Sequence, residues 1–150
     1  MTPSAIKSAN ASTSAASLVA SNVAYLNHQF TTEVREPIQF GIGIHGGEVI
    51  VGDIGFRGHT VFTALGDSVN VAARLQDLTK SLDCKVILSE DVGKTAGIAL
   101  DALTRTEVAI RGRTETMIVR TAADPTVLAS LLDPQSDPAE PQLSEAAVQV

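Results

Sequence analysis

The sequence contains no tryptophan, one tyrosine, four phenylalanines and a single cysteine. With so few aromatic side chains, a buried core has to be built from Val, Ile, Leu and Ala, and 44% of the residues are hydrophobic. The lone thiol, Cys84, excludes an intramolecular disulfide and is typical of a reducing compartment. Because it lies in the apolar run CKVIL, we interpret Cys84 as a buried, inert thiol and not as a nucleophile.

Long apolar runs and basic clusters are also missing. No run approaches the roughly 18 residues of a membrane-spanning helix, and the first residues lack a signal-peptide core, so we expect a soluble, cytoplasmic chain. No basic face or aromatic platform appears, which argues against nucleic-acid binding. The net charge of −6 is concentrated in residues 122–150, which hold five acidic residues and no Lys or Arg, so the rest is nearly neutral.

The first half of the chain predicts one helix followed by strands. We expect residues 1–15, which are small and polar, to form a flexible segment. Apolar residues at steps of three and four then predict a helix that Pro37 stops; its stripe is Ala16, Val19, Val23, Leu26, Phe30 and Val34. The β-branched runs 38–45, 48–54 and 60–65, separated by glycine-bearing turns, predict antiparallel strands.

The second half predicts two more helices, a strand and a hairpin. A helix begins at Asp67 or Ser68 as its N-cap and buries Val71, Leu75, Leu78 and Leu82. A buried strand at 85–88 precedes a short helix that Gly97 ends. The runs 106–110 and 116–121 read as a hairpin, and 124–132 as a last short helix. The proline-bearing end has no core, and we expect residues 122–150 to be an acidic, largely disordered tail. This order indicates an α+β fold with a mostly antiparallel sheet.

Two apparent site motifs have simpler structural interpretations. Gly41, Gly43 and Gly46 fit G-x-G-x-x-G, but the β-branched run EVIVGDIG follows where a dinucleotide-binding helix would have to begin. We therefore favour a strand that closely approaches another backbone. His45, Glu48 and Asp53 suggest metal ligands, but their spacing across glycine turns favours structural polar groups, and we predict no metal site in this chain.

Asn70 and Arg74 form a sharper signal, because residues four apart share one helix face. A solvated polar stripe, continued by Asp77 and Ser81, is one interpretation. The other is a phosphate-bearing cleft, in which a guanidinium meets developing charge on phosphoryl oxygens. Arg111 and Arg113 flank Gly112 in the last hairpin, and they would contact a triphosphate only if this turn lies near the helix.

The runs FGIGIHGGEVIVGDIG and HTVFTALGDSVNVAARLQ resemble the catalytic domain of the class III adenylate and guanylate cyclases, in its bacterial form. KVILSEDV and EVAIRGRTETMIVR continue the resemblance, which covers about residues 16–121. It implies a ferredoxin-like fold and active sites between two domains that meet head to tail. It also implies a phosphorus–oxygen lyase of cyclic nucleotide signalling, which cyclises ATP or GTP and releases pyrophosphate.

The resemblance also assigns individual roles. Asn70 and Arg74 match the pair that orients the ribose and stabilises the transition state from the partner subunit. Thr63 matches the purine-selecting position, where a hydroxyl favours ATP over GTP, and Arg113 matches the basic residue for the terminal phosphates. In the family, two aspartates hold two Mg²⁺ or Mn²⁺ ions. Their segment has no counterpart here, since the first acidic residue is Glu33.

We therefore expect residues 16–121 to be the C-terminal portion of an adenylate cyclase catalytic domain, with an incomplete ferredoxin-like fold. It carries the Asn/Arg half-site without the metal aspartates, so we expect the chain alone to be inactive and weakly stable. Its partners would be ATP and a second cyclase domain. The alternative is a non-catalytic fragment that pairs with an intact cyclase.

Overall fold

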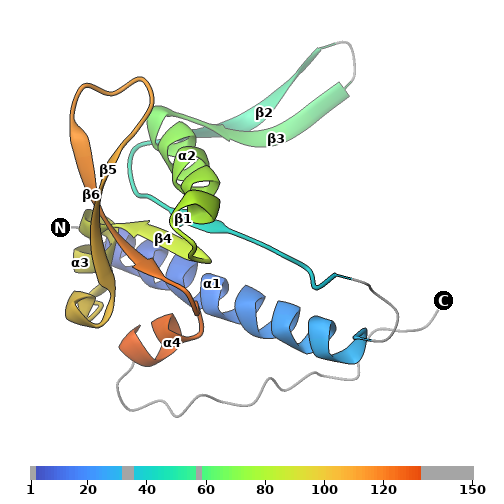
Figure 1. Ribbon diagram of the computed structural model, residues 1–150. Coiled ribbons are helices and arrows are strands. Elements are labelled where there is room, and N and C mark those ends of the chain that lie inside the picture. Colours follow the sequence, from blue (N-terminus) through green and yellow to red (C-terminus); the bar gives the residue numbers. More distant parts are fainter. Residues whose placement is uncertain (1–2, 32–35, 57–58, 133–150) are drawn as a thin grey trace.

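The computed structural model describes residues 3–31, 36–56 and 59–132 of the chain. A long helix is followed by three strands, a second helix, a strand, a third helix and a final hairpin with a short helix after it (Figure 1). The elements are α1 (Pro3–Gln29), β1 (Ile42–Ile44), β2 (Ile50–Phe56), β3 (His59–Leu65), α2 (Asp67–Ser81), β4 (Val86–Ser89), α3 (Glu90–Ala96), η1 (Leu100–Ala102), β5 (Thr104–Ala109), β6 (Thr116–Ala122) and α4 (Val127–Leu132).

Six strands form two separate sheets in the described residues. The main sheet has the order β1-β4-β6-β5, with β1 and β4 parallel and the other neighbours antiparallel. Strands β2 and β3 form a second, two-stranded antiparallel sheet that projects from the body (Figure 1). The predicted α+β fold with a mostly antiparallel sheet is therefore confirmed.

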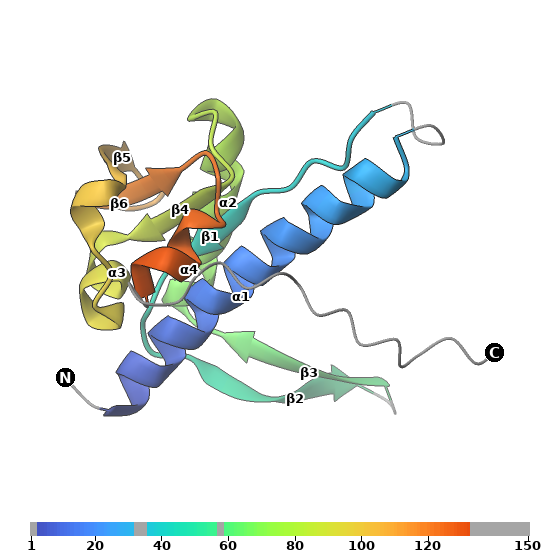
Figure 2. The same cartoon turned by 90° about the horizontal axis from the view of Figure 1, so that it is seen from below.

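Two hydrophobic clusters lie on opposite faces of the main sheet. Helices α1, α3 and α4 cover one face, as Figure 2 shows from below, and α2 covers the other. Strand β4 serves both clusters, because alternate side chains of a strand point to opposite faces. Val86 and Leu88 join the α1 side and Ile87 joins the α2 side, all without solvent exposure. This double burial explains the continuous apolar run in KVIL.

Residues 3–15 correct the predicted flexible segment, because they form the first turns of α1. Proline is favoured at the first helical position and alanine is the strongest helix former. The buried face is made of small residues at steps of four, three and four: Ala9, Thr13, Ala16 and Ala20. Small side chains let α1 lie close to α3 and α4. This close packing takes the place of large apolar side chains, so residues 3–15 show no strong apolar pattern.

The predicted apolar stripe of α1 is correspondingly only partly buried. Ala16 lies in the core, whereas the larger side chains of Val19, Leu26 and Phe30 are exposed. Helix α1 ends at Gln29, before Pro37 as predicted, while Val34 and the preceding Glu33 lie outside the described residues.

The strands after α1 correct a second prediction. The runs 38–45 and 48–54 do not pair with each other, since β1 pairs in parallel with β4 and β2 pairs with β3. The glycine-bearing segment between β1 and β2 leads from one sheet to the other. Only the antiparallel pairing of β2 with β3 agrees with the expected arrangement.

The second half of the chain agrees closely with the sequence prediction. The structure confirms strand β4, helix α3, the β5–β6 hairpin and helix α4. Gly97 ends α3 as its left-handed C-cap. The predicted tail is wrong for residues 122–132, because Ala122 ends β6 and Leu128 of α4 is fully buried. The rest of that tail, residues 133–150, lies outside the described residues, and the domain boundaries stay predictions.

Candidate functional site

Helix α2 is held by its apolar side, which fixes where its polar residues point. Val71 and Leu75 have no solvent exposure and belong to the hydrophobic cluster between α2 and the main sheet. Asn70 is exposed and Arg74 half-buried, so both lie at the edge of the helix that the core does not cover. The predicted buried stripe is thus confirmed for Val71 and Leu75, whereas Leu78 and Leu82 are partly buried. The Asn70 side chain is accessible to a ligand or a partner.

Close backbone packing fixes α2 against the sheet. A Cβ atom on Gly43 of β1 would lie 2.2 Å from the Ala72 carbonyl oxygen and 2.5 Å from the Gln76 nitrogen. Only glycine permits this approach, which confirms the interpretation of the glycine motif as a close backbone contact. The alternative of a dinucleotide-binding loop is wrong, because β1 leads to no helix at Gly46.

The start of α2 corrects the predicted N-cap. Gly66 occupies the N-cap position and no side chain caps the helix. Ser68 instead donates a hydrogen bond of 2.8 Å to the Glu48 carbonyl oxygen, which ties the helix to the segment before β2. The Asp67 carboxylate is then available for an ion pair.

The turn between β5 and β6 lies beside α2, and this contact brings the candidate residues together. The Arg74 guanidinium donates a hydrogen bond to the Arg111 carbonyl oxygen and lies next to Gly112. Gly112 adopts φ of 82°, and the Arg113 backbone N–H donates to the Ile110 carbonyl oxygen at 2.9 Å, which makes the turn tight. The condition set for a shared phosphate site, that this turn lies near the helix, is therefore met.

Two further features lie beside the contact between α2 and the β5–β6 turn. The Arg113 guanidinium forms an ion pair with Asp67 at the start of α2. A cavity of about 420 Å³ lies between α2 and the end of β5, with Arg74, Asp77 and Arg111 among its lining residues. The β5–β6 turn thus contacts α2 twice: the Arg111 carbonyl oxygen accepts from Arg74, and the Arg113 guanidinium pairs with Asp67.

Thr63 lies in β3, opposite Gly52 of β2, and is half-buried. It precedes the end of β3, after which Gly66 leads directly into α2. No hydrogen bond joins Thr63 to Asn70 or Arg74 within residues 3–31, 36–56 and 59–132. Its proximity to a nucleotide base therefore stays a prediction.

His45, Glu48 and Asp53 do not come together. His45 Nδ1 lies 3.0 Å from Ser89 Oγ, at the end of β1. Burial, and secondly the nearby Arg113, lower the pKa of His45, while Asp91 and Asp67 act in the opposite direction. Across the described part of the chain, no group of three or more His, Cys, Asp or Glu side chains is arranged to hold a metal ion.

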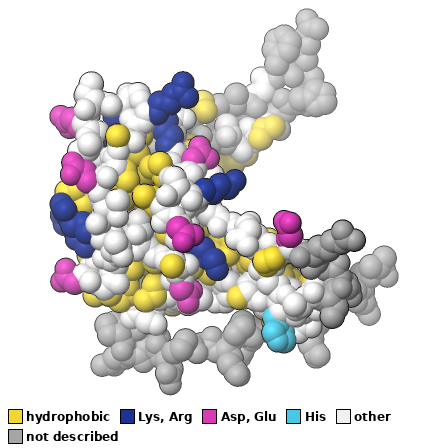
Figure 3. Space-filling model, in the orientation of Figure 1, with side chains coloured by type: hydrophobic (Ala, Val, Ile, Leu, Met, Phe, Trp, Pro, Cys, Tyr) yellow, Lys and Arg dark blue, Asp and Glu magenta, His cyan; other side chains and the backbone are white. Residues whose placement is uncertain are grey.

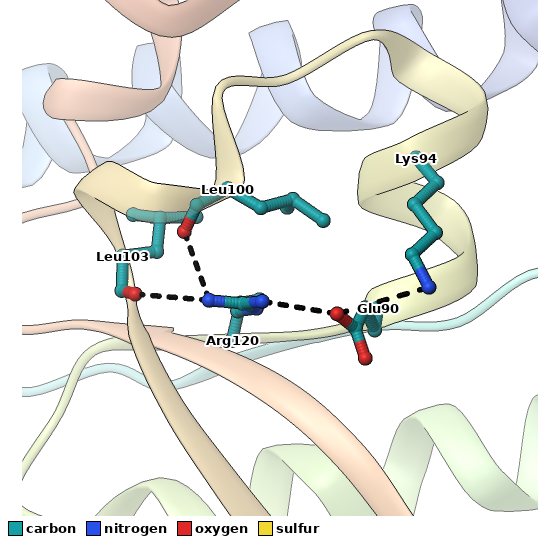
Figure 4. A network of polar contacts seen from close by, with 5 residues as sticks. All are labelled: Glu90, Lys94, Leu100, Leu103 and Arg120. Carbon is teal, nitrogen blue, oxygen red and sulfur yellow. Dashed lines mark hydrogen bonds and ion pairs between the residues drawn. The ribbon is translucent and has the colours of Figure 1, made fainter.

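An ionic network among β6, α3 and η1 was not predicted from the sequence. Arg120 of β6 donates to Glu90 at 2.9 Å, to the Leu100 carbonyl oxygen at 3.1 Å and to that of Leu103 at 3.5 Å (Figure 4). Lys94 lies 3.8 Å from the same carboxylate. The network joins β6, α3 and η1. A lone arginine inside the apolar strand TMIVRTA is the sequence signal that could have predicted a buried partner.

Cys84 is half-buried and free, and it packs beside the α2 cluster. Burial raises the pKa of its thiol, and the neighbouring Asp83 acts in the same direction. Both effects disfavour the thiolate, which is the reactive form of cysteine. The side chain is half-buried and not fully buried as predicted, and its inertness stays a prediction.

The family model of the adenylate and guanylate cyclase catalytic domain matches residues 3–121. An adenylate cyclase of Anabaena cylindrica is 46% identical over 55 residues, which are 37% of this chain and 11% of that protein. An uncharacterized protein of Mycobacterium tuberculosis (strain CDC 1551 / Oshkosh) is 36% identical over 93 residues, covering 62% of this chain and 15% of the relative. This chain thus spans only a small part of the relatives it matches.

The fold has a counterpart among solved structures. The crystal structure of the guanylyl cyclase Cya2 superimposes with a TM-score of 0.62 and 21% identity, covering 81% of this chain and 58% of that one. Among the described residues, no helix is both long enough and apolar enough to cross a membrane. The family match covers most of the chain and includes Asn70, Arg74, Thr63 and Arg113. The chain therefore belongs to the adenylate and guanylate cyclase catalytic domain family.

Proposed function

We propose that this chain supplies the Asn/Arg half of an adenylate cyclase active site, which converts ATP to cyclic AMP and pyrophosphate. The observation that carries the proposal is the contact between α2 and the β5–β6 turn, made by Arg74 and Arg111. It groups Arg74, the exposed Asn70 and Arg113 at one corner of the molecule. An amide and two guanidinium groups at one corner suit a nucleoside triphosphate.

The reaction assigns each of these residues a task. The ribose 3′-hydroxyl gives its proton to water and attacks the α-phosphorus, and the new P–O bond closes the ring. The bond from the α-phosphorus to the oxygen that bridges to the β-phosphorus breaks, and this oxygen leaves with the pyrophosphate. Negative charge shifts to the phosphoryl oxygens and to the leaving pyrophosphate. The Arg74 guanidinium stabilises this charge, Asn70 orients the ribose by hydrogen bonding, and Arg113 binds the terminal phosphates.

Cyclases of this family use Mg²⁺ or Mn²⁺, but the described residues do not fit such an ion, because no three ligand side chains converge. We propose that the metal-binding aspartates are supplied from outside this chain. We accordingly expect the chain to be inactive alone and active only together with a second cyclase catalytic domain.

The second domain would meet this chain head to tail. Large apolar side chains on the β2–β3 hairpin support this, since Ile50 is 78% and Phe62 71% exposed. Figure 3 shows an open notch between the projecting hairpin and the far half of α1. The exposed Ile50 and Phe62 side chains give the hairpin an apolar surface without cover. The same surface favours a second candidate function, a non-catalytic fragment that binds an intact cyclase.

We propose ATP as the substrate because the Thr63 hydroxyl can accept a hydrogen bond from the adenine amino group. The named relatives do not decide between the bases, since one is an adenylate cyclase and the similar structure is a guanylyl cyclase. A cytoplasmic location fits this substrate and the free Cys84 thiol.

The test mixes this chain with a cyclase catalytic domain that has its metal aspartates but lacks the Asn/Arg pair, and follows cyclic AMP formation from ATP and Mn²⁺. Activity only in the mixture, lost when the chain carries Asn70→Ala or Arg74→Ala, is the expected result. Binding without activity, with circular dichroism showing a folded chain, would favour the non-catalytic fragment. Activity of the chain alone would refute the account of the missing metal ligands.

A further inference from the structure

Asp67 and Arg113 belong to different elements and lie 46 positions apart in sequence, yet they form an ion pair. Asp67 is the first residue of α2, and its carboxylate is not used as a helix cap because Gly66 fills that position. Arg113 follows the left-handed Gly112 in the β5–β6 turn. The pair therefore adds a side-chain connection to the backbone contact that Arg74 makes with the same turn.

We propose that Asp67 is a positioning residue that holds the Arg113 guanidinium in place to receive the phosphates of the nucleotide. The inference rests on the proposed function, which makes Arg113 the contact for the terminal phosphates. Asp67 itself, as an anion, would not bind phosphate. Its effect is exerted through Arg113.

The geometry leaves Arg113 able to bind a ligand while it is held. Only Nη2 of the guanidinium pairs with Asp67, and in the described part of the chain Nε and Nη1 make no hydrogen bond. The Arg113 side chain is 39% exposed, so a phosphate can reach these donors. Because the turn is fixed by the bonds at Ile110 and Arg111, both the backbone and the side chain of Arg113 are ordered before a ligand arrives. A side chain ordered in advance loses less entropy on binding.

Other charged side chains lie near Arg113 and could attract its guanidinium. Asp91 lines one cavity with Arg113 and another with His45, so these groups lie around the place where β1 ends and α3 begins. The cavity that Arg113 lines has a volume of about 680 Å³, and Glu90 and Lys94 line it too. Without Asp67, the guanidinium would be free to turn toward these other carboxylates.

The test uses the reconstituted mixture and compares Asp67→Ala, Asp67→Asn and the matched control Asp101→Asn, an exposed carboxylate on η1. We expect Asp67→Ala to raise KM for ATP about two- to fivefold, the range of an exposed ion pair, with kcat changed by less than about twofold. Asp67→Asn keeps an acceptor oxygen, so its effect should be smaller. Asp101→Asn should have none.

A double-mutant cycle separates positioning from a general structural effect. In an Arg113→Ala background, Asp67→Ala should leave KM unchanged, because no guanidinium remains to be held. An equal rise of KM in both backgrounds would overturn the proposal. A fall of KM in Asp67→Ala would overturn it too, since it would mean that Asp67 repels the phosphates.

A readout without catalysis keeps this inference distinct from the proposed function. In the isolated chain, the side-chain NH signals of Arg113 in nitrogen-15 NMR should exchange with water more slowly than in Asp67→Ala. If the parent chain restores no activity but this difference is present, the pair stands and the proposed function fails. Equal exchange in both variants would refute the positioning role, whatever the activity.

Discussion

The Arg74 guanidinium of helix α2 donates a hydrogen bond to the backbone carbonyl of Arg111 in the β5–β6 turn, 37 positions later in the sequence. Together with the Asp67–Arg113 ion pair, this contact joins the helix that carries Asn70 to the turn that carries Arg113. Arg74 therefore has two tasks under the proposed function, since it supports the turn and faces the reacting phosphate. Its five N–H donors are sufficient for both.

Arg74→Ala should lower kcat of the reconstituted mixture about 100- to 1,000-fold, the usual effect of removing a donor that stabilises transition-state charge. Arg74→Lys should not rescue it, because an ammonium group lacks the planar fork. Asn70→Ala is the comparison: as an exposed residue it should change the free energy of unfolding by less than about 0.5 kcal/mol while still reducing activity. Activity near the parent level in either variant would contradict the assigned roles.

Thr63→Val removes a hydroxyl while keeping the shape of the side chain. If the hydroxyl binds the adenine amino group, kcat/KM for ATP should fall about fivefold, as for one lost hydrogen bond, and that for GTP should not. Thr106→Val, on β5, is the matched control. An equal loss for both nucleotides would show that Thr63 acts on the fold and not on the base.

Gly43→Ala should destabilise the protein by about 1–3 kcal/mol, because the new methyl group would meet backbone atoms of Ala72 and Gln76 that cannot move aside. Gly52→Ala is the control, since nothing lies within 4 Å of the added carbon. Its expected change is below about 0.5 kcal/mol. Urea unfolding monitored by circular dichroism measures both, and similar midpoints for the two variants would contradict the close packing of β1 on α2.

The Glu90–Arg120 pair should make stability depend on pH in the acid range. The hydrogen bond from Arg120 lowers the pKa of Glu90 despite an opposing effect of burial. A carboxyl whose pKa is lower in the folded state stabilises the fold above its unfolded pKa, and this is lost as pH falls through the folded value.

The measurement compares the melting temperature of the parent with that of Glu90→Gln. The parent should be more stable at pH 7, and the difference should shrink below about pH 4.3, the ordinary value for glutamate. In an Arg120→Met background, Glu90→Gln should produce no such pH dependence. A difference that stays constant from pH 7 to pH 3 would disprove the role of this pair.

The β2–β3 hairpin should bind a partner through its apolar side chains. Ile50→Ser combined with Phe62→Ser should leave the melting temperature of the isolated chain within about 2 °C, because both side chains are already exposed. The same variant should lose association with a cyclase catalytic domain in analytical ultracentrifugation. Unchanged association would show that the partner binds elsewhere.

Local patterns in the sequence were sufficient to predict a helix or strand wherever its buried face consists of large apolar side chains. The step of four in Val71 and Leu75, the run in β4 and Gly97 after α3 each predicted the observed element. The start of α1 was missed for the opposite reason, since Ala9, Thr13 and Ala16 bury a face with little apolar volume. The pairing of β1 with β4 was missed because it joins segments more than 40 residues apart.

The sequence by itself determined the family, the α+β class and the shared helix face of Asn70 and Arg74, because these depend on residue identity and on helical spacing. Only the tertiary structure decided that the β5–β6 turn lies against α2, that Arg113 pairs with Asp67 and that Arg120 binds Glu90. Those contacts connect residues 30 to 46 positions apart. No local propensity specifies such contacts, since they form only when the sheet brings the elements together.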